Sequence, residues 1–348
     1  MSNNKSNTSG GFMDKLNNLT DTNLLLTITI VVFFLMYIAA MIFQGGAFLK
    51  GQSFLNILNS NSTLIILACG LSLVMITGGI DISVGGVTAL ISMCCAVYLD
   101  LKGGNIFVSI LVALAIGLAF GAVQGFLVAY LDIQPFIITL AGMFFARGMT
   151  TIVHSEPFNV AHEAFNELKN TRIIVPGLGS VNRRGDYIDA YVEIGVIVAI
   201  IVVILMFCMF RWTKLGRSFY AVGGNQQSAL MLGINVKRTR FLSHLICGLL
   251  AGIGGYVYFL HVGSGSPSHA TAMEMDAIAS SIIGGTMLTG GVGNIIGTFF
   301  GVLSLGTIQA IVASAGLGEA WWTGITRAAM LCLFLVIQSL IMARKKKA

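Results

Sequence analysis

The stretch Thr77–Gly86 contains the residues that could do chemistry in an otherwise apolar part of the chain: Asp81, Ser83 and two glycine pairs. It lies between the apolar runs Leu64–Ile76 and Val87–Leu99. A continuous lipid-facing helix does not accommodate it, because freed backbone groups go unpaired in hydrocarbon. Such a break fits a helix end that lines a polar cavity inside the protein.

Two interpretations of Asp81 are open. A carboxylate at membrane depth costs about 2.5–3.5 kcal/mol on insertion scales, so it needs a partner or a purpose. Asp is a favoured cap, and Asp81 could simply accept the amide of Ser83 or Val84 at the next helix start. Alternatively Asp81 lines a substrate path, with or without capping.

A second group of polar residues begins with Glu274 and Asp276, at the outer start of a later apolar span. Acidic residues suit the dipole in a first helical turn, so capping again explains them. Hydroxyls and glycines follow in a narrow stripe, which fits a neutral hydroxylated ligand such as a sugar better than an ion. The candidate substrate-binding residues are therefore Asp81, Ser83, Glu274, Asp276, Ser280 and Ser281.

Two arginines, Arg147 and Arg327, lie within apolar spans. A buried arginine needs a carboxylate or carbonyl groups, and one of the intramembrane acids could supply them. Snorkelling to the membrane interface is the alternative.

Residue patterns for catalysis, metal binding or nucleotide binding are missing from the sequence. The five histidines are scattered, and the six cysteines fall in apolar spans without metal-ligand spacing. The phosphate-binding pattern GxxxxGK[ST] does not occur. We therefore expect a chain that is not an enzyme and binds no cofactor, so any ATP hydrolysis must come from a separate ATPase.

The composition indicates that membrane-spanning helices position the candidate substrate-binding residues and the two arginines. Of 348 residues, 56% are hydrophobic and only 10% are charged, against about 25% charged in soluble domains. We predict an all-α, polytopic membrane bundle of about ten spans, with broken helices near its centre and a short cytoplasmic coupling helix. The third and eighth spans are short and interrupted. The predicted spans are 24–43, 55–76, 84–101, 106–130, 134–153, 191–210, 241–261, 272–288, 295–314 and 321–342.

Lysine and arginine placement predicts the orientation. Basic residues precede the first span, follow the last, and fill the segment 211–240. An even number of spans puts all three groups on one face, which must be cytoplasmic. This topology explains the net charge of +6 better than nucleic-acid binding does.

The same reasoning divides the chain. A polar N-terminal tail (1–23) precedes a transmembrane domain (24–343), and a basic C-terminus (344–348) follows it, with both termini cytoplasmic. The loop 154–190 is extracytoplasmic and should hold turns around one short surface helix. It is either a spacer or a docking surface.

The coupling loop, 211–240, contains a predicted helix of about two turns between the N-cap Asn225 and the glycine stop Gly233. A helix this short must pack on something. It either rests on its own bundle or is presented to a soluble partner. The candidate partner-binding residues are Gly223, Gly224, Asn225, Ala229, Leu230 and Gly233.

Glycines also predict helix packing and an internal repeat. Gly117, Gly121 and Gly125 recur every four residues, a spacing that lets helices approach closely. Thr77-Gly-Gly-Ile and Thr289-Gly-Gly-Val both sit between short apolar segments on one side, which suggests duplicated halves.

The chain after about residue 50 resembles the ribose/galactose-type permeases of bacterial ABC importers. Four motifs carry the resemblance in order: Thr77–Gly85, Pro135–Met143, Ala221–Asn225, and Asp276–Ala279 through Thr289–Gly293. The sequences of Phe136–Gly148 and Gly290–Gly301 most resemble those of the galactofuranose-type branch.

The resemblance implies a permease subunit in the cytoplasmic (inner) membrane of a bacterium. It implies import of a monosaccharide of the ribose, galactose or galactofuranose class, driven by a cytoplasmic ATPase docked on Asn225–Leu232. Other implied partners are a second permease subunit, identical or different, and an extracytoplasmic sugar-binding protein. The alternatives are an ABC permease for branched-chain amino acids or nucleosides, and an ion-coupled secondary transporter.

Overall fold

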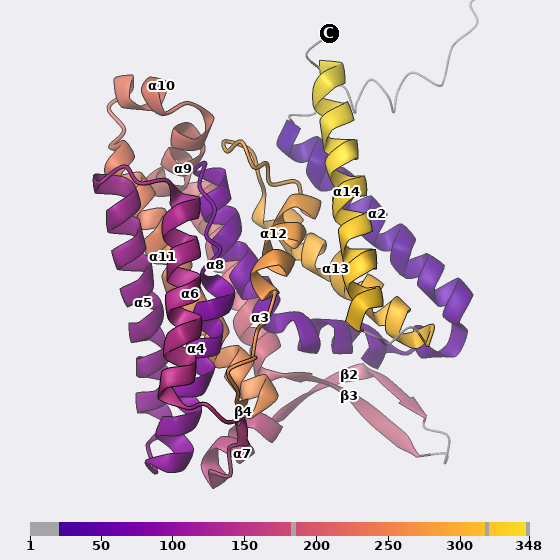
Figure 1. Ribbon diagram of the computed structural model, residues 1–348. Helices are drawn as coiled ribbons and strands as arrows, with labels where there is room; N and C mark the ends of the chain where they lie inside the picture. Colours follow the sequence, from indigo (N-terminus) through magenta and orange to yellow (C-terminus); the bar gives the residue numbers. More distant parts are fainter. Residues whose placement is uncertain (1–20, 182–185, 317–319, 346–348) are drawn as a thin grey trace, which may run out of the picture.

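The protein folds as a bundle of long helices (Figure 1). The structure is a computed structural model that describes residues 21–181, 186–316 and 320–345. Most of the polar tail predicted for residues 1–23 lies outside the described residues, and its last three residues already belong to the first helix. The basic C-terminus predicted at 344–348 is described only as far as Lys345.

Eight helices in the described part of the chain are long and apolar enough to cross a membrane. This confirms the predicted all-α, polytopic fold. The eight helices are α2 (Asp21–Gln44), α3 (Gly51–Ile76), α4 (Val84–Ala96) with the π-helical turn η2 (Val97–Leu101), α5 (Ile106–Tyr130), α6 (Pro135–Val153), α8 (Ile194–Trp212), α11 (Val236–Val262) and α13 (Ile295–Ser314). A short 3-10 turn, η1 (Gly45–Ala47), joins α2 to α3.

Two further helices lie at the two remaining predicted spans, but neither is among these eight. The last helix, α14 (Ala320–Lys345), has 26 residues, or about 39 Å, but its apolar stretch is the shorter Gly324–Val336. By contrast, α12 (Met273–Ile283) has 11 residues, or about 17 Å, roughly half of the hydrocarbon thickness. The span predicted at 272–288 is thus interrupted, as expected, and its helix ends at Ile283. A turn at Gly285, where φ is +88°, follows it.

The loop between α6 and α8 contains more structure than the sequence predicts. The expected surface helix is present as α7 (Glu163–Asn170). The description of the rest as turns is wrong, because β2 (Arg172–Val181) and β3 (Tyr187–Glu193) form an antiparallel hairpin. This hairpin also moves the start of the span predicted at 191–210 to Ile194. A shorter pair joins β1 (Phe158–Asn159) to β4 (Ser264–Gly265).

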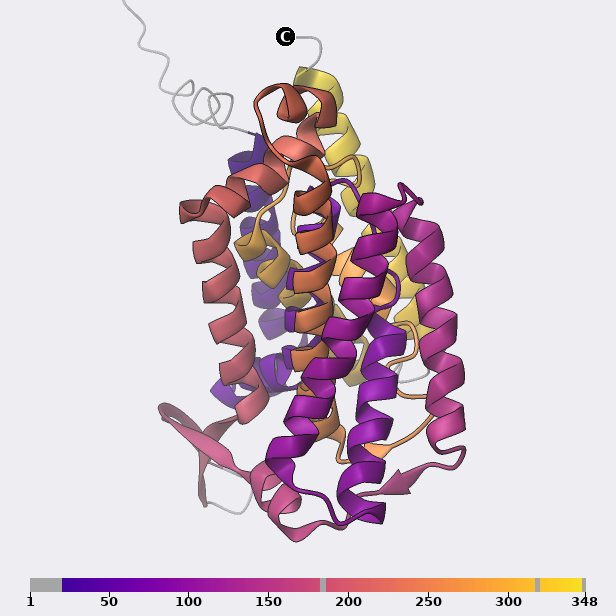
Figure 2. The same ribbon diagram turned by 90° about the vertical axis from the view of Figure 1, so that its left-hand side faces the viewer.

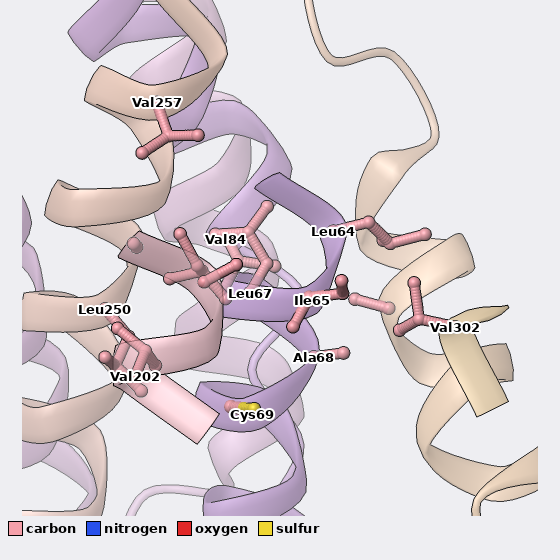
Figure 3. Close-up of a cluster of buried hydrophobic side chains, with 14 of the residues drawn as sticks. Leu64, Ile65, Leu67, Ala68, Cys69, Val84, Val202, Leu250, Val257 and Val302 are labelled. Atoms are coloured by element: carbon pink, nitrogen blue, oxygen red, sulfur yellow. The ribbon is translucent and has the colours of Figure 1, made fainter. Parts of the chain in front are cut away.

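The helix α3 forms the centre of the bundle. Within its most apolar window, 94% of the residues are buried. Figure 3 shows Leu64, Ile65 and Leu67 of α3 in a buried cluster with side chains of neighbouring helices, among them Val257 of α11 and Val302 of α13. From Leu64 to Ile76 every residue of α3 is buried, so this part of α3 is the element around which the others pack.

The predicted glycine face of α5 packs on α11. A Cβ atom on Gly117 would lie 2.7 Å from the Cα atom of Gly252, and one on Gly121 would lie 3.0 Å from the Cα atom of Gly248. Only glycine permits so close a backbone approach. The helix-packing interpretation of these glycines is confirmed.

At one end of the bundle, α8 leads into two short helices, α9 (Lys214–Gly224) and α10 (Gln226–Met231). Figure 2 shows these helices at the end of the molecule opposite the β2–β3 hairpin. The sequence predicts α10 but not α9, whose residues were interpreted only as a basic segment before the coupling helix.

Candidate functional site

Two breaks in the helices meet at the end of the bundle that carries α9. Residues 77–83 separate α3 from α4, and residues 284–294 separate α12 from α13. Both breaks turn on glycines with left-handed backbone, since φ is +85° at Gly78 and +82° at Gly290. A Cβ atom on Gly290 would lie 3.0 Å from the Cα atom of Gly78. The two Thr-Gly-Gly motifs are therefore in direct backbone contact.

The end of α9 joins this contact. The amide of Gly291 donates a hydrogen bond to the carbonyl oxygen of Ile76 at 2.9 Å. A Cβ atom on Gly223 would overlap the same oxygen and lie 2.7 Å from the nitrogen of Gly291. The hydroxyl of Tyr220 donates to the carbonyl oxygen of Gly293 at 2.8 Å. We call the contact of Ile76, Gly223 and Gly291 the glycine junction.

The coupling helix has the predicted boundaries. Asn225 caps α10 by accepting the amide of Ser228 at 2.8 Å, and Gly233 ends the turn with a φ of +78°. Ala229 is buried beneath the helix. A predicted N-cap and glycine stop are thereby confirmed.

Three consecutive apolar side chains are exposed at the tip of α10. Leu230, Met231 and Leu232 are 64%, 82% and 78% exposed, respectively. Leu230 also lines a groove of about 700 Å³, whose lining includes Arg240 and Asp132, an ion pair of 3.0 Å. A run of exposed apolar residues is unusual on a water-facing surface and is typical of interaction sites.

The six predicted partner-binding residues thus have different surroundings. Gly223 lies inside the glycine junction, whereas a Cβ atom on Gly224 would have no atom within 4 Å. Asn225 and Gly233 shape the ends of α10, Ala229 packs inward, and Leu230 is exposed. Contact of any of them with another chain stays a prediction.

Asp81 lies at the start of α4 and is buried. Its Oδ1 atom accepts hydrogen bonds from the amide of Ser83 at 2.9 Å and from the Ser83 hydroxyl at 2.6 Å. The same hydroxyl lies 3.2 Å from Oε1 of Gln124 on α5. The predicted bond to the Ser83 amide is confirmed, but Ser83 is itself the N-cap residue and no side chain caps α4. Asp81 therefore closes a turn just before the helix, and contact of Asp81 or Ser83 with a substrate stays a prediction.

Glu274 of α12 reaches the same helix start. Its side chain is buried, and a Cβ atom on Gly85 would overlap its Oε2 atom. No described residue makes a hydrogen bond to that oxygen. The N-terminus of a helix carries about half a positive charge, which favours a carboxylate. The helix α4 therefore begins between two carboxylates, Asp81 and Glu274.

The segment that leads into α12 has an unusual backbone. Ala270 and Ala272 have φ angles of +50° and +62°, a region that costs a non-glycine residue roughly 1–3 kcal/mol. Arg147 of α6 donates to the carbonyl oxygens of His269 and Ala270, the latter at 2.8 Å. The guanidinium group holds two successive carbonyls at once. This confirms that Arg147 is satisfied by carbonyl groups.

Asp276 pairs with the second intramembrane arginine. Its Oδ1 atom lies 2.6 Å from Nε of Arg327, and the two side chains are 15% and 24% exposed. The pair links α12 to α14. It confirms the prediction that an intramembrane acid supplies the partner of an arginine.

Ser280 and Ser281 lie deeper along α12, and both are buried. The Ser281 hydroxyl donates to the carbonyl oxygen of Ala277 at 2.8 Å and lies 3.3 Å from that of Ala68 on α3. The backbone of Ser280 meets α13 at Gly301, where a Cβ atom would overlap the Ser280 carbonyl oxygen. In this conformation the two serines face protein, and their predicted contact with sugar stays a prediction.

Sequence reasoning missed Gln124 and Tyr220. Gln124 was included only in an apolar span, although a single amide in such a helix marks a polar contact. Tyr220 gives no comparable signal, because an aromatic residue in a cytoplasmic segment is common. Only the fold places its hydroxyl next to Gly293.

These features define a class of protein: a multi-pass helical membrane protein with two helix breaks in contact, one half-length helix (α12) and a short helix (α10) that exposes an apolar tip. Broken helices of this kind are typical of membrane transporters. The chain belongs to the family described as "branched-chain amino acid transport system / permease component", whose family model matches residues 53–335. Members of this family are multi-pass proteins of the inner membrane, and this chain is one of them.

Several curated proteins are similar to the chain over most of its length. The inner membrane ABC transporter permease protein YjfF of Escherichia coli K12 is 36% identical over 316 residues, covering 91% of this chain and 92% of that protein. The fructose import permease protein of Bifidobacterium longum is 32% identical, with 93% of each chain covered. The ribose import permease protein of Escherichia coli K12 is 34% identical, with 82% and 84% covered. No solved structure matches the chain significantly.

Proposed function

We propose that this chain is the membrane-spanning permease subunit of an ATP-driven, binding-protein-dependent importer of a monosaccharide. Similarity over nearly the whole chain to proteins named as fructose and ribose import permeases supports a sugar substrate. A branched-chain amino acid or a nucleoside is the second candidate, since the family description names branched-chain amino acids. A galactofuranose-type substrate stays a prediction from the sequences of Phe136–Gly148 and Gly290–Gly301.

The proposed assembly has four kinds of chain. A second permease subunit, identical or different, pairs with this one, and a cytoplasmic ATPase docks on Leu230, Met231 and Leu232 of the α10 tip. An extracytoplasmic binding protein delivers the sugar at the other end, where α7 and the β2–β3 hairpin lie. This chain acts as a transport subunit without enzymatic activity, and ATP is bound by the ATPase.

The proposed orientation puts the α9–α10 end and both termini in the cytoplasm. Basic residues concentrate at this end, and the positive-inside rule assigns such loops to the cytoplasmic side. The basic residues of this end are Arg211, Lys214, Arg217, Lys237, Arg238 and Arg240.

The glycine junction is the observation that carries the proposed mechanism. The tip of α10 connects through Asn225 to α9, which ends in contact with both Ile76 and Gly291. Ile76 directly precedes the break before α4, and Gly291 lies within the break before α13. When ATP binds to the ATPase and α10 moves, both breaks would therefore shift together. This shift would open the substrate path to one side of the membrane and close it to the other.

A pull-down from gently solubilised membranes tests the proposal. We expect an ATPase chain to co-purify with the unchanged protein and to be lost when Leu230, Met231 and Leu232 are all replaced by serine. The control is Leu101→Ser, because Leu101 is also exposed but belongs to η2. Recovery of this chain alone, together with sugar uptake by vesicles that lack ATP, would favour an ion-coupled secondary transporter instead.

A further inference from the structure

A polar stripe runs along the first turns of α3, far from the acids described above. Ser53, Asn56 and Ser60 follow the spacing of one helix face. Asn56 and Ser60 are exposed, although α3 is otherwise the most buried of the candidate membrane spans. Exposed polar side chains within a span face a water-filled cavity or another polar surface, because lipid offers them no partner.

This stripe forms one wall of a pocket of about 380 Å³. Phe48 and Ile57 contribute apolar surface, and Gly306 and Gln309 of α13 line the opposite wall. The volume falls in the range of about 300–1,000 Å³ that is typical of small-molecule sites. Gly306 allows α13 to lie close to α3, since a Cβ atom at this position would lie 2.5 Å from Nδ2 of Asn61.

The chemistry of the lining is that of a neutral hydroxylated ligand. The described residues that line the pocket include no charged side chain. Asn56 uses Oδ1 to accept a bond of 2.7 Å from Gln52, which leaves its amide nitrogen as a donor. Within the described chain, the side chains of Ser60 and Gln309 make no hydrogen bond. Amides and hydroxyls can both donate to and accept from sugar hydroxyls, whereas an amino acid would bring two charges without partners.

The pocket lies at the end of α3 that holds the β2–β3 hairpin. The amide of Tyr191 in β3 donates to Oε1 of Gln52 at 2.8 Å, and Gln52 is the neighbour of Ser53. Figure 1 shows this end of α3 beneath α14, opposite α10. In the proposed orientation this is the extracytoplasmic end, where the binding protein releases its sugar.

We propose that the pocket between α3 and α13 is an outer sugar subsite, in which Asn56, Ser60 and Gln309 hydrogen-bond to sugar hydroxyls before translocation. The inference rests on the proposed function and adds to it a place where the permease itself contacts its substrate. The inference also distinguishes a sugar substrate from an amino acid, because an uncharged subsite can bind a sugar but offers no partner for the charges of a zwitterion.

Uptake by the complete transporter in vesicles, with its ATPase and binding protein, tests the subsite. The double variant Asn56→Leu/Gln309→Met removes the polar groups at similar volume. Using labelled ribose, galactose and fructose, we expect uptake of the transported sugar to fall about tenfold, from the loss of two hydrogen bonds. Co-purification of the ATPase should be unchanged, and more ATP should be hydrolysed per sugar. Thr151→Val, on the exposed side of α6, is the matched polar-to-apolar control.

The two proposals fail in different ways. Normal sugar uptake by the double variant, with the control also normal, would overturn the subsite and leave the importer intact. Uptake of leucine but of none of the three sugars by the unchanged protein would overturn the proposed function and the subsite together.

Labelling of Ser60→Cys with a membrane-impermeant maleimide tests occupancy directly, with the unchanged protein as the background. We expect the transported sugar to slow labelling several-fold and leucine to have no effect. Equal protection by leucine, or no protection by any sugar, would contradict the proposal. Oxidative cross-linking of two Ser60→Cys chains would instead assign this face to contact between copies.

Discussion

The carbonyl oxygen of Ile76 accepts a hydrogen bond from the amide of Gly291, which joins the last turn of α3 to the break before α13. Gly223 packs against this bond from α9. The three residues meet through backbone atoms, so no flexible side chain absorbs a displacement of one segment relative to the others. Packed backbones transmit strain because protein interiors are poorly compressible.

Gly223→Ala tests this contact. The added methyl group would overlap the Ile76 carbonyl, and overpacking of this kind typically costs 1–3 kcal/mol. We expect sugar uptake by reconstituted vesicles to fall at least about tenfold, while the ATPase still co-purifies because the α10 tip is unchanged. Gly224→Ala is the neighbouring comparison, since its methyl group meets no atom within 4 Å. Equal losses in both variants would show that the junction is not the cause.

Asp81 permits a test of local hydrogen bonding against substrate contact. Asp81→Asn keeps a carbonyl oxygen for the Ser83 amide, whereas Asp81→Ala loses this bond at a cost of about 1 kcal/mol. If this bond is its whole role, the melting temperature and uptake should stay near normal in the Asn variant and both should fall in the Ala variant. Loss of uptake in the Asn variant at unchanged melting temperature would mean that the charge itself acts in transport.

The pair of Asp276 and Arg327 is suited to a double-variant cycle. Asp276→Asn or Arg327→Gln alone should lower stability by about 1–3 kcal/mol, because each leaves one charge unpaired; this range is reduced for the partial exposure of both groups. The double variant should recover most of the melting temperature. Recovery of uptake as well would limit the pair to joining α12 and α14. Recovery of stability without uptake would support the predicted contact of Asp276 with sugar.

Arg147→Lys should weaken the segment before α12. A lysine ammonium is a point charge that cannot match the guanidinium fork across two carbonyls, so Ala270 and Ala272 would be free to leave the left-handed region. We expect uptake to fall several-fold and a cysteine at Thr271 to react faster with a soluble maleimide. An unchanged labelling rate would show that the arginine does not hold this backbone.

Hydrophobic length and glycine patterns were enough to predict the membrane fold. Apolar runs near the length of a bilayer appear as α5 and α13 almost residue for residue. Asn225 and Gly233 predicted the ends of α10 because capping chemistry is local. The hairpin of β2 and β3 was missed, since its residues lie in a polar loop where tertiary contacts outweigh local patterns.

The candidate site was predicted residue by residue but not as an arrangement. Sequence alone identified Asp81, Glu274 and the two arginines as residues that need partners. It could not pair Arg327 with Asp276 or bring Gly223 to Ile76, because these contacts join segments far apart in the chain. Ser60 and Gln309 escaped notice for the same reason, since each is unremarkable until α3 and α13 form a common pocket.

The close contact between α5 and α11 also bears on how the chain enters the membrane. Gly117 and Gly121 are made long before Gly248 and Gly252, and at typical synthesis rates the delay is on the order of ten seconds. During that delay the glycine face of α5 has no α11 to pack against. Glycine carries no polar side chain, so the waiting helix loses only packing and not hydrogen bonds. Serine or asparagine side chains on this face could form hydrogen bonds with other helices during the delay, whereas glycine has no side chain that could do so before α11 is made.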